Sequence, residues 1–175
     1  MKAKLDTLLK EKKASTKDAF QIFDALEPAT ADFMIGRWKG YSIYSEHQLD
    51  GELESTGWYG KMFLNREEVH PLLFFTEDKK EIFSVNPTGR IASSSQQKDK
   101  TVGLEKTKLA KARLRNTEYR GRLCATMIYD ELPVLDVFVK IDDTKVLGVM
   151  DKKDDPTSFF FILERDDQSN LKLDI

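Results

Sequence analysis

The stretch Gly36-Arg37-Trp38-Lys39-Gly40 decides the fold, and Gly57-Trp58-Tyr59-Gly60 echoes it about twenty residues later. Two glycines that bracket a tryptophan just after a short helix are typical of the first strand of a small β-barrel, in which the tryptophan closes one end. Glycine at such positions lets the backbone approach a neighbour closely or adopt a positive φ. We therefore predict a barrel with a lumen, and a lumen suggests a bound small molecule.

The composition is that of a soluble globular protein. The chain has 175 residues, of which 40% are hydrophobic and 33% charged, and this length suits one domain. The net charge of −2 gives no overall indication of nucleic-acid binding. The N-terminus lacks the apolar core of a signal peptide, and no apolar run is long enough to span a membrane.

Cysteine and histidine are scarce. Cys124 is the single cysteine, so no disulfide forms within the chain, and we expect a cytoplasmic location. With two histidines, a zinc site would need carboxylate ligands, and we expect no metal. A homodimer is left open.

The N-terminal segment is predicted to be helical. Residues 1–13 form a charged, weakly amphipathic helix, and Ser15 is placed to cap a second helix with Asp18 three residues later. Pro28 ends that helix, and a short helical turn leads into Gly36. We therefore divide the chain into a helical segment, 1–28, and a single barrel domain, 29–175.

The rest of the chain has the residue pattern and turn spacing that are typical of β-strands. Their short spacing, without crossover helices, predicts an antiparallel sheet of about eight to ten strands that closes or nearly closes. Asp50-Gly51 is predicted as a hairpin turn and 92–103 as a mobile loop. The predicted strands are 38–45, 53–64, 71–76, 81–85, 109–118, 121–129, 134–141, 146–150 and 158–164.

The motifs together resemble a bacterial family that is named for its GxWxG motif and followed by a C-terminal domain of unknown function. The resemblance covers about residues 20–165 and implies a common fold with no settled activity. The matching segments are 26–28, 36–40, 57–61, 69–73, 83–87, 112–115, 119–121, 127–130, 133–140 and 147–151.

A looser resemblance is to the calycins, the lipocalin and fatty-acid-binding barrels. They share a lead helix, a G-x-W at the first strand, and a late arginine that packs across the tryptophan. The resemblance implies an all-β, calycin/lipocalin-like antiparallel barrel. It gives structural roles to Gly36, Gly40 and Trp38, with Arg165 as the late arginine. Such a cation–π contact contributes ~0.5–2 kcal/mol.

Strand 134–141 carries the most informative side chains. Asp136, Phe138 and Lys140 share one face, and the charged pair is separated by about 13 Å along the strand, so the two do not pair. If this face points into the lumen, they become a polar anchor or a catalytic pair, and if it points outward they are solvated charges. Tyr129 ends the preceding strand, near the same rim.

Two further residues are candidates for a ligand site. Trp58 lines a pocket or fills the core. His70 is a candidate haem ligand or general base, although a lone histidine is more often structural. The predicted ligand-binding set is Trp58, His70, Tyr129, Asp136, Phe138 and Lys140.

A basic stretch precedes an acidic C-terminal region. Residues 98–122 hold nine Lys and Arg against three acids. Lys111, Arg113 and Arg115 share one strand face, which would contact an anionic lipid surface or nucleic acid, or complement the acidic C-terminal strands. We favour the last interpretation because stacking aromatics are not interleaved with the basic residues.

The sequence contains no catalytic motif among those sought, such as G-x-S-x-G, H-E-x-x-H or a Walker A loop. The first hypothesis is binding of a small, largely apolar molecule in the lumen. The alternatives are a small enzyme that uses His70, Asp136 and Lys140 as acid–base groups, and a haem-binding protein that uses His70. No other cofactor and no specific nucleic acid is expected.

Overall fold

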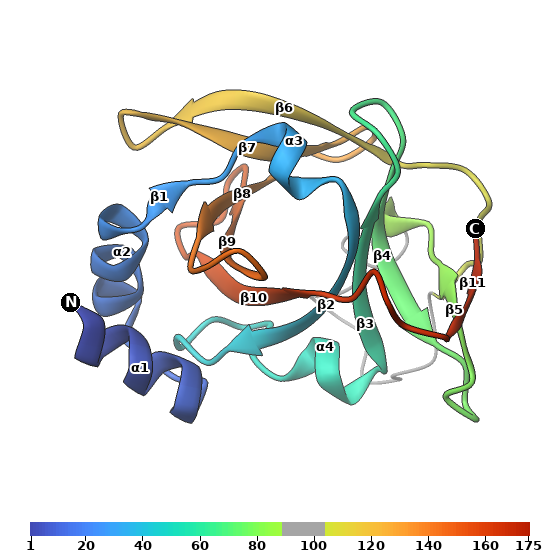
Figure 1. Cartoon of the computed structure of the whole chain (residues 1–175), viewed down its shortest axis with the longest axis horizontal. Coiled ribbons are helices and arrows are strands. Elements are labelled where there is room, and N and C mark those ends of the chain that lie inside the picture. The colour runs from blue at the N-terminus through green and yellow to red at the C-terminus, as the bar shows by residue number, and fades with distance from the viewer. Residues whose placement is uncertain (89–103) are drawn as a thin grey trace.

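A computed structural model describes residues 1–88 and 104–175. Eight strands form a closed antiparallel barrel in the order β4-β3-β2-β10-β9-β8-β7-β6, with β6 returning to β4 (Figure 1). The prediction of an all-β antiparallel barrel is confirmed. The predicted loop 92–103 lies outside the described residues. The barrel strands are β2 (Gly36–Ile43), β3 (Trp58–Phe63), β4 (Val69–Phe75), β6 (Ala112–Tyr119), β7 (Arg122–Tyr129), β8 (Val134–Lys140), β9 (Lys145–Lys152) and β10 (Phe159–Arg165).

The barrel closes through a narrow seam between β4 and β6. Val69 pairs with Ala112, and the Lys111 amide donates to the Val69 carbonyl at 3.1 Å. The later part of the same β4 edge pairs instead with β5 (Glu81–Ser84), to which β11 (Lys172–Asp174) adds in parallel. The seam therefore has far fewer backbone hydrogen bonds than the β6–β7 hairpin, which pairs over its full length.

Two N-terminal helices, α1 (Lys2–Glu11) and α2 (Thr16–Ala25), pack on the outside of the barrel (Figure 1). The Ser15 hydroxyl accepts the Asp18 amide at 3.1 Å, which is the predicted N-cap. Ile22 and Phe23 are buried in one cluster with the outward face of the sheet, including Val137. Val137, Val139 and Ile141, from the outward face of β8 and the residue after it, therefore pack beneath the helices. The strand β1 (Glu27–Pro28) pairs with β8, and α3 (Ala31–Met34) leads into β2.

The prediction of a hairpin at Asp50-Gly51 and of a strand from residue 53 is wrong. Gly51, at φ 77°, caps the short helix α4 (Glu52–Ser55), and β3 begins at Trp58. Local side-chain hydrogen bonds explain the difference, because they offer the backbone an alternative to a sheet ladder. The Asp50 carboxylate accepts the Ser45 and His47 amides at 2.8 and 3.0 Å.

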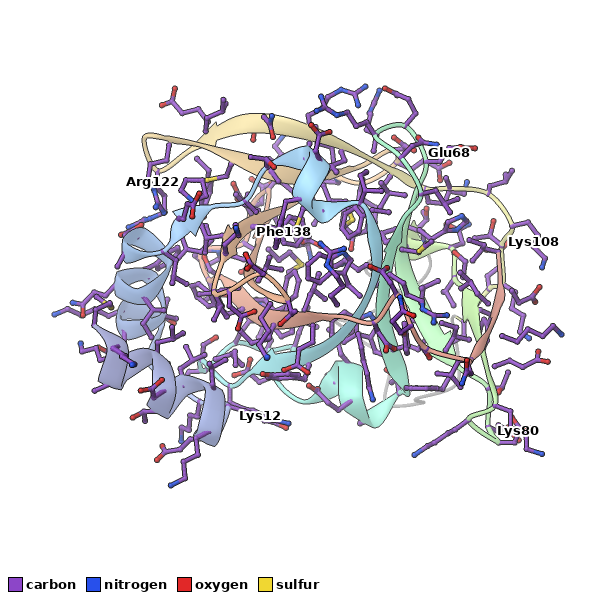
Figure 2. The ribbon with its side chains drawn as sticks, viewed as in Figure 1. Lys12, Glu68, Lys80, Lys108, Arg122 and Phe138 are labelled. Carbon is purple, nitrogen blue, oxygen red and sulfur yellow. The ribbon has the colours of Figure 1, made fainter. Side chains whose placement is uncertain are left out.

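Aromatic and aliphatic side chains fill much of the barrel. Figure 2 shows Phe138 inside the ring of strands, whereas the labelled charged residues, such as Glu68 and Lys108, lie around its outside. A separate cluster around Tyr59 and Leu73 lies on the outer face of β3 and β4, where the C-terminal segment packs. Among the described residues, no helix is long and apolar enough to cross a membrane.

Candidate functional site

The two glycine–tryptophan motifs interlock. A Cβ on Gly40 would lie 2.2 Å from Trp58 Cη2, and a Cβ on Gly60 would lie 2.0 Å from the Trp38 carbonyl oxygen. Each motif therefore leaves room for the other. A glycine is needed in both, because a side chain at that position would overlap the neighbouring segment. This contact fixes the Trp58 ring against the inner wall of the barrel.

One end of the barrel is closed around Trp38. Its Nε1 donates to the Met34 carbonyl at 2.7 Å, and the Arg165 guanidinium carbon lies 4.2 Å from its ring centroid. Arg165 also donates to the Phe33 and Ile35 carbonyls at 2.6 and 2.9 Å, which have no helical partner at the end of α3. These residues close the end of the barrel.

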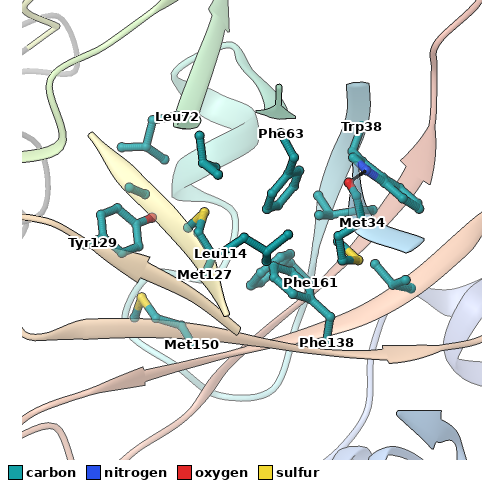
Figure 3. Close-up of a cluster of buried hydrophobic side chains, with 14 of the residues drawn as sticks. Met34, Trp38, Phe63, Leu72, Leu114, Met127, Tyr129, Phe138, Met150 and Phe161 are labelled. Atoms are coloured by element: carbon teal, nitrogen blue, oxygen red, sulfur yellow. Dashed lines mark hydrogen bonds between the residues drawn. The ribbon is translucent and has the colours of Figure 1, made fainter. Parts of the chain in front are cut away.

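A cavity of about 60 Å³ remains toward the other end. Figure 3 shows Tyr129, Leu72 and Met150 on this side of the buried cluster, with Trp38 and Met34 opposite. This volume accommodates a few waters or a small group. Because so little space remains, the protein's own side chains occupy most of the lumen. The apolar lining comes from Leu49, Leu53, Leu72, Met150, Phe159 and Phe161.

A buried ion pair lies in the wall of this apolar cavity. Lys61 Nζ lies 2.8 Å from Asp136 Oδ2, and each side chain is 3% exposed. Lys61 also donates to the Pro71 carbonyl at 3.0 Å. The Tyr129 hydroxyl forms a hydrogen bond with the Asp136 carboxylate. Three polar side chains from β3, β7 and β8 thus meet at one point.

Lys61 faces inward because the strands are irregular at this place. The β3–β4 register shifts between Trp58 and Gly60 and again between Gly60 and Met62. Strict alternation from the buried Trp58 would place Lys61 on the outer face. The first bulge reverses that alternation, and sequence reasoning missed Lys61 for this reason. The second irregularity places the extra residue on β4, at Pro71 and Leu72 across from Lys61, and the Pro71 carbonyl accepts from Lys61.

Burial dominates the electrostatics of the site. Burial raises the pKa of Asp136 above its usual value, while the Lys61 charge and the hydrogen bonds from Lys61 and Tyr129 oppose that rise. Burial, and then the negative charge of Asp136, raise the pKa of Tyr129 well above 10. The Phe161 ring centroid lies 5.2 Å from Lys61 Nζ, so an aromatic face also contacts the ammonium group.

The mixed face of β8 points inward, but its residues have separate surroundings. Phe138 belongs to the inner cluster and contacts Phe63 and Phe161 edge-on, outside the cavity lining. Lys140 lies 3.5 Å from Asp143 and 4.6 Å from the Phe33 ring centroid. The structure does not bring Lys140 to Asp136, which pairs with Lys61 instead.

His70 is buried away from the cavity. Its Nδ1 lies 2.9 Å from the Ser84 hydroxyl, and it does not line the cavity. Burial lowers the pKa of His70 below its usual value. The structure therefore does not bring His70, Asp136 and Lys140 together at one point. No group of three or more potential metal ligands occurs in 1–88 and 104–175.

The outer basic stripe is paired with acids from neighbouring segments. Lys111 lies 2.9 Å from Glu131, Arg113 lies 3.4 Å from Asp130, and Arg115 lies 2.8 Å from Glu67. The partners come from the β7–β8 and β3–β4 connections. Acidic side chains therefore complement the basic stripe, as expected. These acids lie in connections between strands and not in the C-terminal strands.

The comparisons with known proteins follow the two halves of the barrel. The family model described as GXWXG protein matches residues 21–79, and the model for a domain of unknown function (DUF4334) matches 110–165. A crystal structure of a protein from Thermomonospora curvata is 32% identical, with a TM-score of 0.73, over 95% of this chain and 99% of that chain. The chain belongs to the GXWXG family.

Membership of the GXWXG family confirms the resemblance found in the sequence. In this GXWXG protein the two matched regions contribute jointly to the cavity, because Lys61 comes from the first and Tyr129 and Asp136 from the second. Among functionally curated proteins, no sequence matches the chain.

Proposed function

We propose that the barrel binds a small, neutral, largely apolar molecule in the cavity, with Lys61, Asp136 and Tyr129 as its polar anchor. The observation that carries the proposal is the buried Lys61–Asp136 pair in a wall that is lined mainly by apolar side chains. Apolar walls with a few convergent polar groups are typical of small-molecule sites. The calycin resemblance, in which ligands occupy the lumen, supports the same function.

The ion pair is costly for a barrel that serves as a scaffold alone. Removing two charges from water costs several kcal/mol for each ion, and well-packed apolar residues often stabilise a core equally well. Ordinary β-barrel packing therefore does not require Lys61 and Asp136. Binding a polar group of a ligand accounts for the presence of the pair, whereas stability does not.

The pair also selects the kind of ligand. An ammonium group has three N–H donors, and Asp136 and Pro71 accept from Lys61 in the described part of the chain. One donor remains for an acceptor such as a carbonyl or hydroxyl oxygen. A carboxylate ligand would lie beside Asp136 with the same charge, so a neutral molecule is favoured.

Access to the cavity involves the connection between β2 and β3. Leu49 and Leu53 of this connection line the cavity, and Glu54 fastens α4 to β2 by accepting the Ser42 amide and hydroxyl. Loops of this kind are where small binding sites open. We infer that a ligand enters when α4 moves away from the barrel.

Native mass spectrometry of the freshly purified full chain tests the proposal. We expect an added mass that is lost on unfolding, and loss of that mass in Leu53→Trp, whose larger side chain fills the cavity. Leu123→Trp is the matched control, since Leu123 is 65% exposed on the outer surface. Retention of the added mass by Leu53→Trp would contradict lumen binding.

A further inference from the structure

We propose that this site is catalytic as well as binding: it exchanges the proton on the carbon next to a ligand's carbonyl group, with Asp136 as the base. The inference rests on the proposed binding function and names its ligand class, a small neutral ketone or aldehyde. It is carried by the placement of a carboxylate, an ammonium group and a phenol on one wall of an apolar cavity.

The carbonyl oxygen of the ligand is positioned by Lys61. The available Lys61 N–H is the strongest donor for it, because hydrogen bonds from charged donors are about twice as strong as neutral ones. In the described residues, the other polar side chains among those that line the cavity are Glu52, Trp58, Tyr129 and Asp136. The Trp58 indole N–H is already bonded to the Gly60 carbonyl at 3.1 Å. A carbonyl ligand is therefore held with its oxygen at Lys61.

Asp136 is positioned to act as the base. Asp136 Oδ2 lies 2.8 Å from Lys61 Nζ, so a carbonyl bound at Lys61 has its neighbouring carbon beside the carboxylate. An ionised carboxylate offers about four lone-pair sites, and Lys61 and Tyr129 occupy two. Burial also raises the proton affinity of Asp136, which makes it a stronger base than a solvated aspartate.

The Lys61 ammonium stabilises the negative charge that develops on the carbonyl oxygen. The C–H bond breaks, its proton goes to Asp136, and the electron pair moves onto the carbonyl oxygen to form an enolate. The Lys61 ammonium faces that oxygen in a cavity with apolar walls, where a fixed donor acts more strongly than in water. Exchange of the Asp136 proton with deuterated water and return of a deuteron to carbon complete the cycle, with HDO as co-product.

The test is deuterium incorporation into cyclopentanone by the full chain in deuterated water, followed by NMR. We expect exchange above the buffer rate, and a decrease of about 100-fold or more in Asp136→Asn, as for loss of a general base. Asp143→Asn removes an exposed carboxylate near the end of the same strand and should retain the wild-type rate. Because Asp136→Asn leaves Lys61 unpaired, the double variant Lys61→Met/Asp136→Leu provides a folded control that should also lack exchange.

Binding and catalysis fail separately in this design. Cyclopentanone that binds in the cavity without exchange above buffer overturns the proton-transfer proposal and leaves the binding function intact. Exchange at the wild-type rate in the folded Lys61→Met/Asp136→Leu variant also overturns it. Exchange in the wild type that is lost in Leu53→Trp as well as in Asp136→Asn supports catalysis in the cavity.

Discussion

At the residue scale, the site depends on one lysine in an unexpected orientation. Lys61 lies in the second glycine–tryptophan segment, and a bulge turns it toward Asp136. The partners depend on each other, because each is buried and charged. Removing one leaves an uncompensated charge, whereas replacing both with apolar groups removes the desolvation cost as well.

Asp136→Asn should therefore lower the free energy of unfolding by ~3–5 kcal/mol, the usual result of breaking a buried ion pair. The double variant Lys61→Met/Asp136→Leu should be as stable as the wild type or more stable. Urea unfolding measures both. Equal losses in the single and double variants would show that the Lys61–Asp136 pair is itself net stabilising, and that the unpaired charge does not set the cost.

Gly40→Ala should destabilise the barrel by ~1–3 kcal/mol, because the added methyl group would overlap the distal edge of the Trp58 ring. In a Trp58→Phe background the same substitution should cost less, since the smaller ring leaves space. A double-mutant cycle by urea unfolding measures this coupling. Additive effects would mean that the backbone at Gly40, and not the ring, is the constraint.

At the element scale, most strands were predictable from the sequence, and the exceptions have physical causes. The predicted strands 109–118, 121–129 and 134–141 correspond to β6, β7 and β8, because each depends on local spacing. The helix at Glu52–Ser55 was missed because hydrogen bonds accepted by the Asp50 and Glu54 carboxylates, not periodicity, hold it in place.

The candidate site was predictable in part. Asp136 and Tyr129 stand out as polar groups at the rim of predicted strands, and both line the cavity. Lys61 could not be found by alternation, because a one-residue bulge exchanges the two faces of a strand. Lys140 does not line the cavity, and its partner Asp143 lies in the turn that follows.

The β4–β6 seam is expected to be the weakest part of the barrel. Its amides, including that of Leu114, which donates to the Arg66 carbonyl at 2.8 Å, should exchange with deuterium faster than those of the β6–β7 hairpin. Hydrogen exchange followed by mass spectrometry compares the two regions. Equal protection would indicate that the barrel opens as one cooperative unit.

At the scale of the whole molecule, stability should fall in mild acid partly because of His70. Burial lowers the pKa of His70 in the folded protein, whereas the unfolded chain takes up a proton below about 6.5. The unfolded state therefore binds more protons, and the free energy of unfolding decreases as the pH falls below that value. Urea titrations at pH 7 and pH 5 should show a smaller decrease for His70→Gln, and an unchanged decrease would remove His70 as the cause.

The whole barrel combines a closed end with an apolar cavity whose wall holds a buried ion pair. Arg165 and Trp38 close one end, and the two matched regions of the chain both contribute to the cavity wall. This division explains why the proposed ligand site is not visible in either region alone. The polar anchor forms when the barrel closes.

The most direct measurement of lumen binding is NMR of methyl-labelled methionine in the full chain during titration with cyclopentanone. Met150 lines the cavity, whereas Met62 packs against the outer cluster around Tyr59 and serves as an internal control. We predict that the Met150 methyl signal shifts in a saturable way and that the Met62 signal does not. A titration that leaves Met150 unchanged, or moves Met62 alone, would contradict binding in the cavity.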